Sequence, residues 1–69
     1  MKLLDVVILA RDLPSTHLQK GQVGTIVEVY SPEAFEVEFV DLNGKTYGLE
    51  TLNASQLMQI HYSPLPQTV

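Results

Sequence analysis

The chain has 69 residues, no cysteine, and eight acidic against four basic residues, a formal net charge of −4. A chain of this length makes one small domain, and without cysteine it cannot be held together by disulfides. The basic residues are scattered and outnumbered, which disfavours binding to nucleic acid or to an anionic membrane. These basic residues are Lys2, Arg11, Lys20 and Lys45.

The composition also bears on compartment, metals and partners. The stretch LLDVVILA carries Asp5 and is too short for a secretory signal, and no segment approaches the ~20 apolar residues that span a bilayer, so we expect a cytoplasmic protein. His17 and His61 are far apart and no thiolate exists, so we expect no metal and no cofactor. Because small cores are weak, we expect reinforcement by a partner protein or by weak homo-oligomerisation.

The first part of the chain predicts a buried strand and a long connection. Residues 3–10 are rich in valine, isoleucine and leucine, and Pro14 then closes the option of a helix. A polar connection of about ten residues follows over residues 11–21, which is long for a hairpin. Leu13 and Leu18 are its expected inward anchors.

The rest of the chain predicts a β-meander and a short last strand. Period-two alternation marks strands over residues 23–30 and 35–40, and turn residues occupy 31–33 and 41–45. A strand over 45–52, a break at 53–55 short enough for a 3₁₀ turn, and a strand over 57–62 complete the pattern. The sequence therefore predicts an all-β, SH3-like five-stranded small barrel over residues 1–62, with a flexible tail over 63–69.

Side-chain parity indicates the register of the strands, because directly opposed residues share a face of the sheet. A two-residue Asn-Gly loop would set Phe39 opposite Gly48 and mix the two faces. A three-residue loop over 42–44, with Gly44 in the left-handed conformation, keeps them separate. The expected pairs are Phe39 with Tyr47, Val37 with Leu49, Val29 with Phe35, and Val27 with Val37.

These registers gather glutamates on the outer face. Glu28 is expected opposite Glu36, and Glu36 opposite Glu50, with Glu38 two residues along. Like charges directly opposite one another destabilise a sheet. This row of opposed glutamates, called the rung below, is therefore a candidate docking face for a basic partner. The alternative is a solvated outer face without a role. A weak divalent-ion site is disfavoured, because the acids lie on strands and not in a ligand-rich loop.

The long connection carries Asp12, Ser15, Thr16 and His17, a combination that invites a hydrolase interpretation. The nucleophile and the base are close neighbours in a loop without oxyanion donors, so we expect no enzyme. The connection is either a simple polar loop or a recognition loop.

Aromatic residues offer a further possibility, a groove for proline-rich peptides built by Tyr30, Tyr47 and Tyr62. This is disfavoured because the chain has no tryptophan and Tyr47 is expected in the core. The residues that we expect to contact a partner are Glu28, Glu36, Glu38, Glu50, Tyr30, Asp12 and His17.

Two resemblances add to this reading. The segment GQVGTIVEVY…FEVEFVD resembles the KOW-type element of ribosomal and transcription-elongation proteins, in which a glycine lets the strand bend; Gly21 and Gly24 stand at its glycine positions, but the RNA-gripping basic residues are missing. From Leu3 to about Ile60 the chain resembles a family of small stand-alone bacterial proteins known only as a domain of unknown function. The residues that carry this resemblance are Asp5-Val6-Val7, Asp12-Leu13-Pro14, Gly21-Gln22-Val23-Gly24-Thr25, Glu36-Val37-Glu38-Phe39 and Thr51-Leu52.

The family resemblance implies an SH3-like barrel and, because some members occur alongside candidate toxin genes, an antitoxin or immunity role. We therefore expect a non-enzymatic protein-binding module whose acidic face docks a basic protein, with a toxin-like protein as candidate partner. Two alternatives stay open. One is a KOW-like module that binds RNA or a ribonucleoprotein; the other is a self-associating structural subunit.

Overall fold

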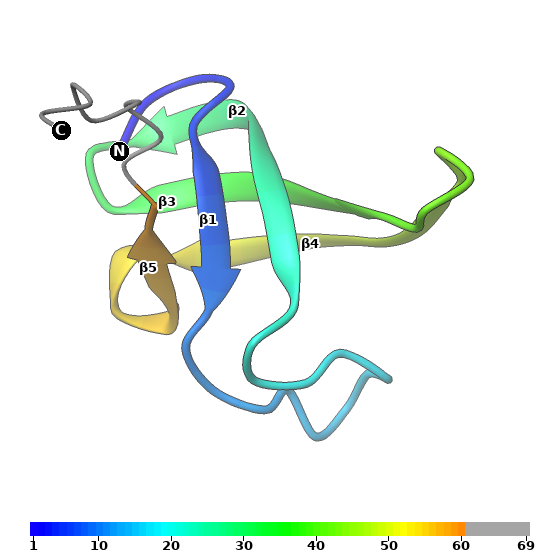
Figure 1. The fold of residues 1–69 in the computed structure, drawn as a ribbon. Coiled ribbons are helices and arrows are strands. Elements are labelled where there is room, and N and C mark those ends of the chain that lie inside the picture. The colour runs from blue at the N-terminus through cyan, green and yellow to red at the C-terminus, as the bar shows by residue number, and fades with distance from the viewer. Residues whose placement is uncertain (61–69) are drawn as a thin grey trace, which may run out of the picture.

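Five antiparallel strands form one sheet in the computed structural model, which describes residues 1–60 (Figure 1). The elements are β1 (Val6–Leu9), β2 (Val23–Ser31), β3 (Ala34–Val40), β4 (Thr46–Asn53), the 3₁₀ turn η1 (Ala54–Gln56) and β5 (Leu57–Gln59). The predicted all-β fold, with a 3₁₀ turn before the last strand, is confirmed. The last strand ends at Gln59, short of the predicted residue 62. The expected tail over 63–69, and the expected domain boundary at 62, lie outside the described residues.

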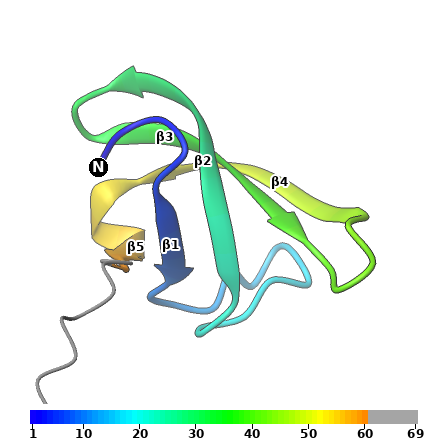
Figure 2. The same cartoon turned by 45° about the horizontal axis from the view of Figure 1, so that its top comes forward.

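The strand order is β4-β3-β2-β1-β5, so β4 and β5 are the two ends of the sheet. The first part of β2 pairs with β1 and the remainder pairs with β3. Because β2 bends between these parts, β1 and β5 run across β3 and β4 (Figures 1 and 2). The sheet is bent in the manner of a small barrel, but it is not closed, since β4 and β5 are joined through η1 and do not pair.

The core lies inside this bend and is entirely apolar within the described residues. Leu18 comes from the long connection and is 1% exposed, and Leu13 packs against the same cluster, so both predicted inward anchors are confirmed. Tyr47 also packs against the core, with its ring 6.3 Å from that of Phe39. The buried residues are Val7, Leu9, Leu18, Ile26, Phe35, Val37, Phe39, Leu52 and Leu57.

Gly24 lies opposite Val7, where β2 leaves β1 and turns towards β3. A Cβ atom at this position would lie 2.6 Å from Val37 Cγ1 and 3.1 Å from the backbone oxygen of Glu38. No side chain fits that space without movement of β3. A glycine is therefore needed here because the backbones approach closely at the bend.

The turn between β3 and β4 is the predicted three-residue loop. The Asp41 N–H donates to the Lys45 oxygen at 2.9 Å, and the Gly44 N–H donates to the Asp41 oxygen at 3.0 Å. Gly44 has φ +80°, the left-handed conformation expected for it. The Asp41 side chain adds an Asx-type turn, since its Oδ1 accepts from the backbone N–H groups of Asn43 and Lys45.

The register beyond this loop differs from the prediction. Val40 lies opposite Thr46, but the next pair is Phe39 with Gly48, so Tyr47 is an extra residue that forms a β-bulge. The expected pairs of Phe39 with Tyr47 and of Val37 with Leu49 are therefore wrong. An extra residue in one strand reverses the facing of every side chain that follows it.

A second bulge occurs in β2. Val29 lies opposite Phe35, as predicted, but Val37 lies opposite Ile26 and not opposite the expected Val27. Val27 is the extra residue, and Ile26 takes the fully buried position. The bulge lies in the part of β2 that pairs with β3, just beyond the bend, and bulges increase the local bending of a strand.

Candidate binding surface

The outer face is defined here as the face of β2, β3 and β4 that points away from the core. Glu36 and Glu38 alternate on β3 with the buried Phe35, Val37 and Phe39 and therefore lie on this face, both half-buried. Glu28 of β2 lies opposite Glu36, as predicted, and is exposed. These three glutamates form the acidic part of the outer face.

Glu50, the third glutamate of the predicted rung, lies elsewhere. Glu36 faces Thr51 on β4, whereas Glu50 lies opposite Val37. Since Val37 is fully buried, Glu50 belongs to the inner face, at the edge strand, and is half-buried there. The expected rung of three glutamates is wrong in its third member, because the bulge at Tyr47 reverses the facing of β4.

Hydroxyl groups hold the two carboxylates of β3. Thr51 Oγ1 donates to Glu36 Oε1 at 2.6 Å, and the Tyr30 hydroxyl donates to the same oxygen at 3.3 Å. Thr46 Oγ1 donates to Glu38 Oε2 at 2.6 Å. Ionised carboxylates have about four acceptor sites, so both groups keep capacity for an ammonium or guanidinium group.

Tyr30, another residue that the sequence proposes as a partner contact, belongs to the same surface. Its side chain is 59% exposed and its hydroxyl reaches Glu36. Desolvation raises the pKa of Tyr30 above its ordinary value, and the negative charge of Glu36, the hydrogen bond to Glu36 and the charge of Glu28 act in the same direction. The hydroxyl therefore stays protonated at neutral pH and acts as a donor.

An exposed leucine lies among these groups, and sequence reasoning missed it. Leu49 lies opposite Glu38 on the outer face and is 53% exposed. The sequence placed this side chain inward, because the bulge at Tyr47 leaves no signal in the alternation of apolar and polar residues. The outer face therefore combines carboxylates with an apolar contact.

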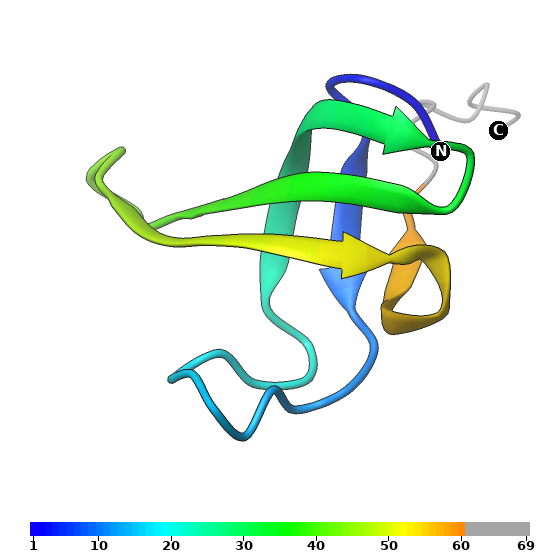
Figure 3. The ribbon, with the colours of Figure 1, turned by 180° about the vertical axis from the view of Figure 1, so that it is seen from behind.

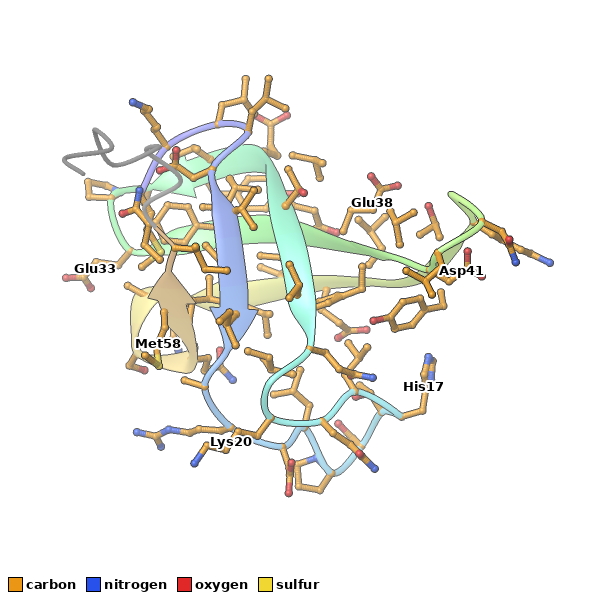
Figure 4. The ribbon with its side chains drawn as sticks, in the orientation of Figure 1. His17, Lys20, Glu33, Glu38, Asp41 and Met58 are labelled. Carbon is orange, nitrogen blue, oxygen red and sulfur yellow. The ribbon has the colours of Figure 1, made fainter. Side chains whose placement is uncertain are left out.

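The other two predicted contact residues, Asp12 and His17, lie on the long connection and not on the outer face. Asp12 Oδ1 accepts from the Lys20 backbone N–H at 2.8 Å, which closes the loop on itself. His17 Nε2 lies 2.7 Å from the Tyr47 backbone oxygen, and Figure 4 shows His17 at the tip of the loop below the β3–β4 hairpin. The structure does not bring Asp12 and His17 into one site with the glutamates.

A small open hollow lies beside η1. It has a volume of about 390 Å³ and is lined by Glu33, Asn53, Ala54 and Ser55. Within residues 1–60, no group of three or more His, Cys, Asp or Glu side chains could hold a metal ion. In the same part of the chain, no helix has the length and hydropathy to cross a membrane.

The fold and this surface define a small all-β domain with an acidic outer face. The family model described as Domain of unknown function (DUF4926) matches residues 3–59, and the chain belongs to this family. The predicted membership of a domain-of-unknown-function family is thereby confirmed. Searches of curated proteins and of solved structures find no match.

Proposed function

We propose that this protein is a non-enzymatic binding module whose outer face docks a basic surface of another protein. The observation that supports it best is the pair Glu28 and Glu36, two carboxylates directly opposite one another on neighbouring strands. Such like-charge pairs destabilise an isolated sheet, and a cationic partner would turn this repulsion into attraction.

The ordering of the side chains supports the same function. Glu36 and Glu38 are held by Thr51 and Thr46 before any partner arrives. Docking onto a preordered surface loses less side-chain entropy than docking onto a mobile one. The exposed Leu49 beside Glu38 would supply apolar contact area within an otherwise charged interface.

The class of partner follows from charge and from the family resemblance. The surface calls for a protein with clustered lysine or arginine, and the resemblance of the chain adds a toxin-like protein as the candidate. Neutralisation of such a protein would require only that the acidic face cover its basic surface. No chemistry by Asp12 or His17 is part of this function, since both side chains are engaged in separate contacts.

Charge reversal tests the proposal. The protein is immobilised and exposed to a lysate of its native organism, and the retained proteins are identified. The affinity of each purified candidate for the purified protein is then measured. The double variant Glu36→Lys, Glu38→Lys should weaken binding by at least about tenfold, with a steep dependence on salt for the unaltered protein.

The control is Glu33→Lys, which makes half of the charge change of the double variant and is therefore matched to the single variant Glu36→Lys. Glu33 lies in the turn between β2 and β3, at the far end of β3 from Glu38, so the change falls in a different place (Figure 4). Equal losses for the control and the double variant, or binding that ignores salt, would contradict docking through the acidic face. Retention of mixed RNA at low salt, lost steeply as salt rises, would favour the KOW-like alternative instead.

A further inference from the structure

Among residues 1–60, the edge strand β4 has one side without a neighbouring strand. It is the last strand of the sheet on that side, with the long connection near one end and η1 at the other (Figure 3). Along an antiparallel strand, residues alternate between those whose N–H and C=O groups face one neighbour and those that face the other. Half of the backbone groups of β4 therefore point away from β3.

The hydrogen bonds at the end of β4 show which residues these are. The Ala54 N–H donates to the Glu33 oxygen on the β3 side at 2.9 Å. The preceding N–H, of Asn53, donates to the Gln56 side chain at 2.9 Å, away from β3. Counting back by two, the N–H and C=O groups of Thr51 and Leu49 also face the free edge.

Side chains cap the two ends of this edge. Gln56 Oε1 accepts a hydrogen bond from the Asn53 N–H, and His17 Nε2 donates one to the Tyr47 carbonyl oxygen. Between the caps lie the backbone groups of Leu49 and Thr51, two donors and two acceptors. The exposed edge is thus a short window of defined length, suited to an added strand.

The side chains around the window determine which residue types an added strand would need. Leu49 points to the outer face and is 53% exposed, which suits an apolar neighbour. Glu50, between Leu49 and Thr51, points to the other face and is half-buried. A strand added at this edge would place one of its own side chains directly opposite Glu50, and a lysine or arginine there would satisfy the carboxylate.

The same carboxylate argues against a second copy of this chain. A two-fold arrangement that pairs Leu49 of each copy with Thr51 of the other sets Glu50 opposite Glu50, about 4.5–5.5 Å apart between Cβ atoms. The two chains also carry a net charge of −4 each. The opposed Glu50 carboxylates and the net negative charge of both chains disfavour self-pairing through β4, and they favour a basic segment.

We propose that the free edge of β4, from Leu49 to Thr51, binds an extended basic segment of the partner protein as an added strand, with a lysine or arginine opposite Glu50 and an apolar residue opposite Leu49. This rests on the proposed function and names the mode by which a basic partner is held. It is separable from docking on the outer face, because strand addition uses backbone groups that face docking does not.

Backbone amide exchange and peptide titration test the proposal. The probe is a capped peptide of about nine residues that alternates lysine and valine, and its matched control has glutamate in place of lysine. In the free protein, the amides of Leu49 and Thr51 should exchange fast and those of Glu50 and Leu52 slowly. The lysine peptide should slow the first pair by at least about tenfold, and the glutamate peptide should leave them unchanged.

Three other outcomes would contradict strand addition at β4. Changes confined to Glu28 and Glu36, with Leu49 and Thr51 still exchanging fast, would overturn the strand addition while leaving face docking in place. If the amides of Leu49 and Thr51 exchange slowly in the free protein, and more slowly as the protein concentration rises, a second copy occupies the edge and the proposal is overturned. A lysine peptide that does not bind at low salt, at any peptide concentration in the titration, would also contradict the proposal.

Two blocking experiments isolate the backbone contribution. Leu49→Pro removes an N–H that faces the free edge and leaves the ladder to β3 intact, so it should weaken peptide binding about tenfold. Leu49→Thr removes the leucine but keeps the N–H and should change binding by no more than about threefold.

A peptide N-methylated at alternate positions provides the same test without altering the protein. Methyl groups on the side that faces β4 should abolish the slowing of Leu49 and Thr51, and methyl groups on the opposite side should not. Equal binding by the two methylated peptides would overturn the proposal even if Leu49→Pro fails to fold.

Discussion

The imidazole Nε2 of His17 lies 2.7 Å from the backbone oxygen of Tyr47, a residue that follows it by 30 positions in the chain. A carbonyl oxygen only accepts, so Nε2 carries the hydrogen and donates it. Beside this bond, Leu18 packs over Gly48, where a Cβ would come within 3.0 Å of Leu18 Cδ2. The contacts of His17 and Leu18 therefore hold the long connection against the start of β4, close to the turn of the β3–β4 hairpin.

Removing the imidazole should loosen this connection. His17→Ala is expected to lower the free energy of unfolding by about 0.5–1.5 kcal/mol, the typical value of one hydrogen bond. Urea denaturation measures it, and amide exchange should show faster opening of the loop around Leu18. Ser15→Ala, an exposed position on the same connection, is the control and should change stability by less than about 0.5 kcal/mol. Equal effects at both positions would mean that the contact with Tyr47 contributes nothing specific.

The bend of β2 should depend on the absence of a side chain at residue 24. Gly24→Ala places a methyl group 2.6 Å from Val37 Cγ1 and 3.1 Å from the Glu38 backbone oxygen, both on the neighbouring strand β3. We expect a loss of about 1–3 kcal/mol in the free energy of unfolding, measured by thermal or urea denaturation. Gly48→Ala is the matched control, because its added methyl group meets only the flexible Leu18 side chain, and it should cost clearly less.

The opposed carboxylates of Glu28 and Glu36 should lower the stability of the free protein. Glu28→Gln removes one of the two charges and should raise the free energy of unfolding by a few tenths of a kcal/mol at low salt. Added salt should reduce the gain, because the pair is solvent-accessible and screened. Glu33→Gln removes one negative charge outside the outer face, so a gain in stability of the same size there would show a general charge effect and not an effect of the cross-strand pair.

The tyrosine at the same site should titrate late. Desolvation and the neighbouring Glu36 and Glu28 raise the pKa of Tyr30, so Glu36→Gln should lower that pKa towards its ordinary value. NMR titration of the tyrosine ring resonances measures the change directly, and Glu33→Gln should leave the Tyr30 curve where it is. A Tyr30 pKa that ignores Glu36→Gln would contradict the contact between the two side chains.

The raised pKa also sets the direction of a pH effect on stability. The folded protein holds the Tyr30 proton more tightly than the unfolded chain does, so this group favours folding below its unfolded pKa of about 10. That contribution is lost as the pH rises through the folded pKa. Tyr30→Phe should therefore flatten the fall in stability above about pH 10.

Several features of this protein follow from neighbours along the chain, and the sequence predicted them. Asp41 and Gly44 supply the polar and left-handed positions of a three-residue loop, and the structure forms that loop. The apolar runs mark where strands lie, and Leu13 and Leu18 are inward anchors because they are the large apolar residues of an otherwise polar connection. The sequence also determined that the chain is acidic and poor in basic groups.

The facing of the side chains was decided only by the tertiary structure. Ile26 and Val27 are both apolar, so the local pattern cannot tell which of them enters the core; packing against Val37 selects Ile26 and leaves Val27 in a bulge. The bulge at Tyr47 likewise turns Leu49 outward and Glu50 inward. An extra residue in a strand has no local signature, since it is selected by contacts with a neighbouring strand. For that reason the sequence predicted the glutamates, and only the fold decided which of them share a surface.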